Sequence, residues 1–185
     1  MNIVLSWDLF VLVFFSVIIA YSFIVGRNQT LKIIIGTYMA TLTADGFANL
    51  IEQYLGGPTP ILKPLAGPGG DEILIITKIL VFIMVIVIIS IRGGFVVSIL
   101  NERRLPVRVL TTFLFGILNA GLIVSTLLLY VSGLSLIGAD QIVTSSNLGS
   151  DSMLVELMIQ NYNLWFSLPA ISIVVISFIE GEPEA

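Results

Sequence analysis

The chain has 185 residues, of which 57% are hydrophobic and only 11% charged, and its formal net charge is −4. Its mean hydropathy of +1.07 excludes an ordinary soluble domain, which carries roughly a quarter charged residues and cannot hide so much apolar surface. The lack of Cys and His excludes disulfides, zinc fingers and imidazole bases, and eight Lys and Arg residues are too few for a nucleic-acid-binding face. The sequence therefore predicts an all-α, polytopic transmembrane helical bundle that forms a single domain over residues 1–179.

Uncharged apolar runs mark the helices that can cross a bilayer, since the hydrocarbon core requires ~20 apolar residues. The first run, residues 9–26, has no Lys or Arg before it, so we interpret it as an uncleaved span and not as a signal peptide. A short turn over residues 26–30 leads to a second, more polar run at residues 31–55. Residues 56–70 are rich in Pro and Gly, and are expected to form an aqueous loop or to pack on protein.

The second half of the chain contains three further candidate spans, at residues 73–91, 109–131 and 157–179. Pro169 lies inside the last of these, so we expect a kink there. The acidic tail, residues 180–185, is expected to be disordered in the cytoplasm. Five spans are the preferred count, and four are the alternative if residues 31–55 form a re-entrant segment.

The distribution of Lys and Arg favours five spans, because these residues remain on the cytoplasmic side of a membrane. Five spans place six of the eight on that side, namely Arg27, Lys32, Arg92, Arg103, Arg104 and Arg108. The amino terminus is then outside and the carboxyl terminus inside. The last four arginines either set this topology or bind anionic lipid head groups. The aromatic residues agree, since these five would lie near the outer interface: Trp7, Tyr54, Tyr130, Tyr162 and Trp165.

Polar residues recur at every fourth position of the second run, which places them on one face of a helix. This polar stripe consists of Thr37, Thr41, Asp45 and Asn49. A carboxylate inside a span is costly, so Asp45 should face protein or water unless the helix ends early and leaves it near the outer interface. It serves either as part of a proton or ion relay or as a carboxyl held by hydrogen bonds to its neighbours. The sequence does not identify the second titratable group that a proton path needs.

Small residues form a second stripe beside the polar one, at positions Gly36, Ala40, Ala44 and Ala48. Residues of this kind let another helix approach closely. The run 109–131 has a counterpart in Gly116 and Ala120, next to Asn119, which can hydrogen-bond across helices. We therefore predict that these two helices meet through their small-residue faces. The same faces could join the chain to a second copy or to other membrane proteins.

Chemical motifs are missing from the sequence, which contains no recognisable phosphate-binding loop, nucleophile–base pair or metal-binding cluster. We therefore predict no catalytic residue, no cofactor and no metal ligand. The expected partners are the lipid bilayer and membrane proteins.

A family resemblance rests on the first half of the chain and on part of the second. Asp8 precedes the first span, and Gly26-Arg27 is followed by Lys32 and Gly36. Together with residues 107–125, which contain the sequence FGILNAGL, this pattern resembles the colicin V production protein family of bacterial inner-membrane proteins. Residues 56–70 and the long segment after residue 131 depart from the family pattern. The resemblance implies a role in toxin export or envelope maintenance and supplies no catalytic residue.

Two functional hypotheses follow. The leading one is a non-enzymatic inner-membrane protein that acts in a larger membrane assembly, in export or envelope maintenance. The alternative is a small oligomeric ion- or proton-conducting channel, or a transporter subunit, with Asp45 in the path. A membrane enzyme acting on lipid is the weakest hypothesis, because no catalytic set is recognisable.

Overall fold

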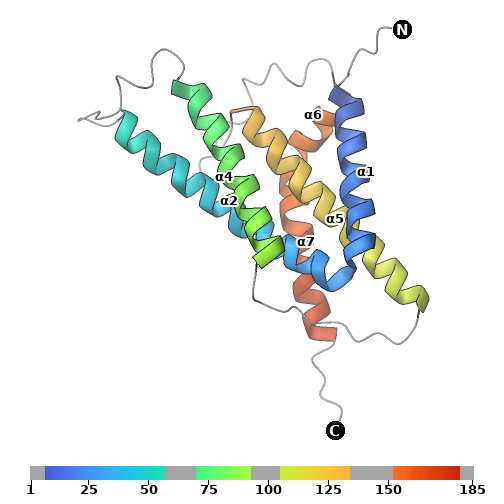
Figure 1. Cartoon of the computed structure of the whole chain (residues 1–185). Helices are drawn as coiled ribbons and strands as arrows, with labels where there is room; N and C mark the ends of the chain where they lie inside the picture. Colours follow the sequence, from blue (N-terminus) through green and yellow to red (C-terminus); the bar gives the residue numbers. More distant parts are fainter. Residues whose placement is uncertain (1–6, 57–69, 93–104, 134–151, 180–185) are drawn as a thin grey trace.

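A computed structural model describes residues 7–56, 70–92, 105–133 and 152–179, which form an all-helical bundle (Figure 1). The helices are α1 (Trp7–Val25), α2 (Arg27–Gly56), α4 (Gly70–Arg92), α5 (Leu105–Val131), α6 (Met153–Gln160) and α7 (Tyr162–Ile179). No strand occurs in these residues, so the predicted all-α fold class is confirmed. Most of the Pro- and Gly-rich segment predicted at residues 56–70, and the acidic tail, lie outside the described residues.

Helix α5 is the central element of the bundle and packs on every other helix. Of its span Val109–Val131, 72% is buried inside the protein, compared with 17% for α1 and only 6% for Ile73–Arg92 of α4. Helix α4 lies mainly against α2, on the outside of the bundle (Figure 1). The bundle is therefore organised around α5, and α4 is much less buried than α5.

Three helices are long and apolar enough to cross a membrane, namely α1, α4 and α5. The pair α6 and α7 makes a fourth candidate, bent by 58° at its break. Helix α2 has 30 residues and runs between the two ends of the bundle, but it is too polar to pass the same test (Figure 1). Length and composition thus identify three or four spans, and the five-span arrangement remains a prediction.

The turn predicted over residues 26–30 is wrong, because Gly26 alone separates α1 from α2. Its φ of +78° is a conformation that glycine adopts readily because it lacks a Cβ. The Gly26 amide donates to the Ser22 carbonyl at 3.0 Å, and the Thr30 amide donates to the Gly26 carbonyl at 3.0 Å. One helix therefore ends and the next begins around a single residue, and α2 starts at Arg27.

The predicted kink at Pro169 is also misplaced, because the break in the last span falls at Asn161. The Asn161 side-chain amide donates to the Leu157 carbonyl at 2.9 Å, and its backbone amide donates to the same carbonyl at 3.2 Å. Asn side chains compete in this way for backbone groups and favour helix ends. Pro169 remains inside α7. The Phe166 carbonyl, one turn before Pro169, accepts a hydrogen bond from the Tyr38 hydroxyl of α2. Neighbouring helices often supply hydrogen-bond partners to backbone groups near a proline in a transmembrane helix.

The small-residue faces of α2 and α5 do not meet each other as predicted. A Cβ added at Gly36 would lie 2.8 Å from the Ile89 side chain of α4, and Ala40 and Ala44 pack against Phe82 of α4 and Tyr130 of α5. On α5, a Cβ at Gly116 would lie 3.3 Å from Ser22 of α1, while Ala120 joins a cluster with Val11 and Ile18 of α1. Each smooth face is thus covered by bulky side chains within the same chain, which leaves neither face available for a second copy.

Candidate functional site

Polar side chains are buried along the contact between α2 and α5, and we call them the polar seam. Each is at most 1% exposed. The polar seam consists of Thr30, Thr37, Thr41 and Asp45 of α2 with Asn119, Thr126 and Tyr130 of α5. Thr37, Thr41 and Asp45 were predicted from the sequence. Asn49, predicted in the same stripe, is exposed, so the buried face ends at Asp45.

Tyr130 connects the two helices at one end of the polar seam. Its hydroxyl donates to the Thr41 carbonyl at 3.2 Å, and the fully buried Asp45 follows Thr41 by one turn of α2. Phe82 of α4 packs edge-on to the Tyr130 ring, with the ring centroids 5.8 Å apart. Lys78 of α4 places its Nζ 6.0 Å from the centroid of the same ring. The buried Asp45 carboxyl therefore lies close to the Tyr130 phenol, and the Lys78 ammonium group lies over the ring of the same phenol.

The two halves of the polar seam are in register. Thr41 and Tyr130 are 89 positions apart, and the same offset relates Thr37 to Thr126 and Thr30 to Asn119. Because α2 and α5 run in the same direction, an equal offset places these pairs at successive levels of the two helices (Figure 1). An apolar cluster also joins Leu31 and Ile34 of α2 to Phe115, Leu118 and Leu122 of α5.

Three of the four threonine hydroxyl groups in the polar seam donate to carbonyl groups of their own helices, and that of Thr30 donates to the Gly26 carbonyl at 3.0 Å. Thr37 donates to Ile33 at 2.8 Å, Thr41 to Thr37 at 2.8 Å and Thr126 to Leu122 at 2.7 Å. A hydroxyl that donates in this way still has oxygen lone pairs that can accept a hydrogen bond. The polar seam therefore presents acceptors along its length.

Asn119 is the polar side chain of α5 whose hydrogen-bonding capacity is unused. Both Oδ1 and Nδ2 of this fully buried amide lack a hydrogen-bond partner in the described part of the chain. Leaving a buried polar group unsatisfied costs about 1–3 kcal/mol, so such a group in a native protein needs a reason to be retained. An amide can both donate and accept, which suits it to bind a mobile polar guest such as water.

The remaining predicted positions lie away from the polar seam. Arg92 is exposed at the end of α4, Arg108 lies in the first turn of α5, and Arg103 and Arg104 are outside the described residues. Trp165 is partly buried and packs against Phe15 of α1, with ring centroids 6.1 Å apart, and its place near the outer interface stays a prediction. The role of the four arginines in topology or lipid binding remains a prediction.

Sequence reasoning missed Tyr130 as a neighbour of Asp45 and Lys78 as a neighbour of Tyr130, and it missed Thr30 and Thr126. A signal was present, because the spacing of Thr30, Thr37 and Thr41 equals that of Asn119, Thr126 and Tyr130. No sequence feature marks Lys78, since only the packing of α4 on α2 brings it to this site. Among the described residues, no three acidic side chains gather to hold a metal ion.

Long apolar helices around a buried polar seam define the class of this chain as a multi-pass α-helical membrane protein. The sequence matches no protein-family profile, no curated protein and no solved structure. The resemblance to the colicin V production protein family is therefore neither supported nor contradicted by comparison.

Proposed function

We propose that this protein is a non-enzymatic membrane protein that conducts protons along the polar seam. Asp45 and Tyr130 are the groups that take up and pass on the proton at one end. The observation that carries this proposal is the burial of the Asp45 carboxyl close to the Tyr130 hydroxyl, which itself hydrogen-bonds to the Thr41 carbonyl one turn away on α2. Acidic residues within transmembrane bundles are costly and typically mark proton or ion pathways.

The length of the polar seam supports this proposal. At 1.5 Å per residue, the distance along α2 from Thr30 to Asp45 is about 22 Å, compared with a hydrocarbon core of about 30 Å. Polar side chains thus occur along most of the thickness of the hydrocarbon core. Asn119 lies within this length and offers both a donor and an acceptor to a guest water molecule.

The burial of the polar seam favours a proton over a hydrated ion. Its seven side chains are at most 1% exposed, and neighbouring side chains cover them from every side. A hydrated cation requires an open, water-filled path, whereas a proton can pass between groups that are already within hydrogen-bonding distance. Lys78 lies next to Tyr130 and would disfavour the approach of a second cation.

Proton flux into liposomes tests the proposal directly. The purified chain is reconstituted with a pH-sensitive dye inside the vesicles, and a potassium diffusion potential drives the flux. Asp45→Asn should lower proton flux about a hundredfold or more, the typical contribution of a positioned proton-transfer group. Glu52→Gln is the matched control, since it makes the same acid-to-amide change at an exposed position of α2 and should leave the flux intact. Unchanged flux in a folded Asp45→Asn protein would assign Asp45 to packing alone.

A second candidate function is a component of a larger membrane assembly, as in the colicin V production-like hypothesis. The observation that favours it is the exposure of α4, which leaves an apolar face available to a partner helix. Because the chain has no Cys, a single cysteine at exposed Ile88 would report such a partner by disulfide crosslinking in native membranes. Exclusive recovery of uncrosslinked monomer would argue against this candidate.

A further inference from the structure

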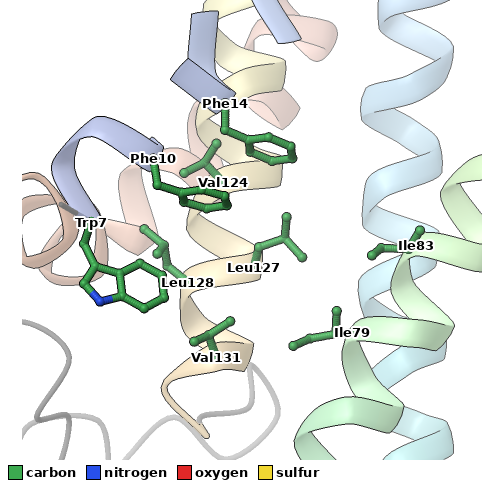
Figure 2. Close-up of a pocket in the computed structure, with 9 residues that line it drawn as sticks. All are labelled: Trp7, Phe10, Phe14, Ile79, Ile83, Val124, Leu127, Leu128 and Val131. Carbon is green, nitrogen blue, oxygen red and sulfur yellow. The ribbon is translucent and has the colours of Figure 1, made fainter. Parts of the chain in front are cut away.

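An apolar groove opens between α1 and α4, with α5 as its floor (Figure 2). Its volume is about 660 Å³, and aliphatic or aromatic side chains line it. The lining includes Trp7, Phe10 and Phe14 of α1, Ile79 and Ile83 of α4, and Leu127 of α5. Figure 2 shows the α4 side chains facing those of α1 and α5 across an open space. The groove lies on a different face of α5 from the polar seam.

We propose that this apolar groove binds an acyl chain of a membrane phospholipid. The groove opens between two helices of which only a small share is buried in the protein, α1 at 17% and α4 at 6%. It therefore faces the hydrocarbon of the bilayer. Water is not stable in a cavity that lacks polar partners, so the molecules available to fill the groove are lipid tails.

A transmembrane helix from a second copy fits the groove poorly. A helix is about 10 Å wide and rises about 5.4 Å per turn, so 660 Å³ corresponds to only about one and a half turns. Helix contacts in membranes also rely on small residues, and the groove has none among its lining residues. The close-approach positions Gly36, Gly116 and Gly121 already receive side chains of this same chain. A thin and flexible acyl chain can follow such an uneven wall, whereas a rigid helix cannot.

Trp7 indicates from which end the lipid enters. This residue begins α1, lines the groove and is 41% exposed. Tryptophan side chains prefer the level of the lipid head groups, where the ring meets both hydrocarbon and water. The head group therefore lies near Trp7, and the acyl chain extends along the groove toward Phe14 and Ile83. This inference does not depend on proton conduction.

Lipid retention and mapping test the proposal. The wild-type protein, purified in a mild detergent from vesicles of phosphatidylcholine and phosphatidylglycerol, should retain a phospholipid molecule in native mass spectrometry. Leu127→Trp fills the groove and should lower this retention about tenfold, as expected when bulk is forced into a fitted site. Leu114→Trp is the matched control, because Leu114 is 47% exposed on the same helix and does not line the groove.

A second measurement uses only the wild-type protein, so it holds even if Leu127→Trp fails to fold. Phosphatidylcholine with a photoactivatable diazirine in its acyl chain is incorporated into the vesicles, and the crosslinked residues are mapped by peptide mass spectrometry. Adducts should concentrate on Ile79, Ile83 and Leu127 over the outward-facing Met84 and Ile88 of α4. Equal labelling of both sets, or a wild-type protein that retains no phospholipid, would overturn the proposal.

Discussion

The Asp8 carboxylate and the Ser152 hydroxyl join the first turn of α1 to the start of α6. Asp8 Oδ1 accepts a hydrogen bond from Ser152 Oγ at 2.5 Å and another from the Leu154 amide at 3.0 Å. Ser152 Oγ in turn accepts from the Val155 amide at 3.3 Å and caps α6. Backbone amides at a helix start need such acceptors, and a negative charge is favourable there. Asp8 therefore holds together two helices that are far apart in the sequence.

Removal of this carboxylate should loosen α6 from α1. We expect Asp8→Ala to lower the temperature of unfolding in detergent, because the Leu154 amide loses its acceptor and the Ser152 hydroxyl loses its partner. Asp8→Asn keeps one acceptor oxygen and should cause a smaller loss. Thermal unfolding followed by size-exclusion chromatography measures both. Glu156→Gln, at an exposed acid in the first turn of α6, serves as the control. An unfolding temperature equal to that of the wild type in Asp8→Ala would show that the contact does not support the fold.

A second prediction concerns the close contact of Gly121 with Trp165. A Cβ at position 121 would lie 1.9 Å from Cε3 of the indole, so Gly121→Ala must displace the ring. We expect a loss of about 1–3 kcal/mol in unfolding free energy, the usual cost of overpacking a tight site. Unfolding of the reconstituted or detergent-bound protein by denaturant provides the measurement.

Gly46 gives the matched control for this substitution, because nothing lies within 4 Å of a Cβ added there. Gly46→Ala should be neutral or should stabilise the helix by up to about 1 kcal/mol, as expected from helix propensity. When Trp165→Leu is combined with Gly121→Ala, the smaller side chain should restore much of the stability that Gly121→Ala alone removes. Equal effects of the two glycine substitutions would contradict the packing argument.

Asn119 allows stability and proton flux to be separated. Asn119→Leu replaces a buried amide that lacks partners by an apolar side chain of similar size, so unfolding stability should stay the same or rise by about 1–3 kcal/mol. If the amide binds a water molecule of the proton path, the same substitution should lower proton flux in liposomes. A stable but inactive protein is the expected result. A variant that conducts like the wild type would remove Asn119 from the path.

The five-span arrangement predicts that the two ends of the chain lie on opposite sides of the membrane. The chain has no Cys, so single cysteines placed by Asn2→Cys or Glu184→Cys can be labelled without background. A membrane-impermeant maleimide should label the first in intact cells and the second only after lysis. Labelling of both positions from the same side would rule out five spans.

The apolar runs allowed α1, α4 and α5 to be predicted within a few residues, because an uncharged run of this length in a bilayer has no alternative to a helix. Helix α2 was predicted as a helix, but its start was missed because a single glycine with positive φ replaces the expected turn. The break at Asn161 was missed because proline carries the stronger sequence signal for a kink, although the Asn161 side chain provides the better helix end.

Part of the candidate site could also be predicted from the sequence. Four-residue spacing identifies which side chains share a helix face, so Thr37, Thr41 and Asp45 were found together. The same spacing does not show which helix covers that face. The pairing of Asp45 with Tyr130, and the packing of Gly36 on Ile89, depend on how separate helices are arranged in space.

The one-residue junction at Gly26 has a consequence for biosynthesis. The ribosome delivers α1 and the polar α2 as a single hairpin, long before α5 has been translated. During that interval Thr37, Thr41 and Asp45 lack the helix that later covers them, and lipid is a poor substitute. The buried polar face of α2 therefore gains its cover only after residues 112–130 have been translated.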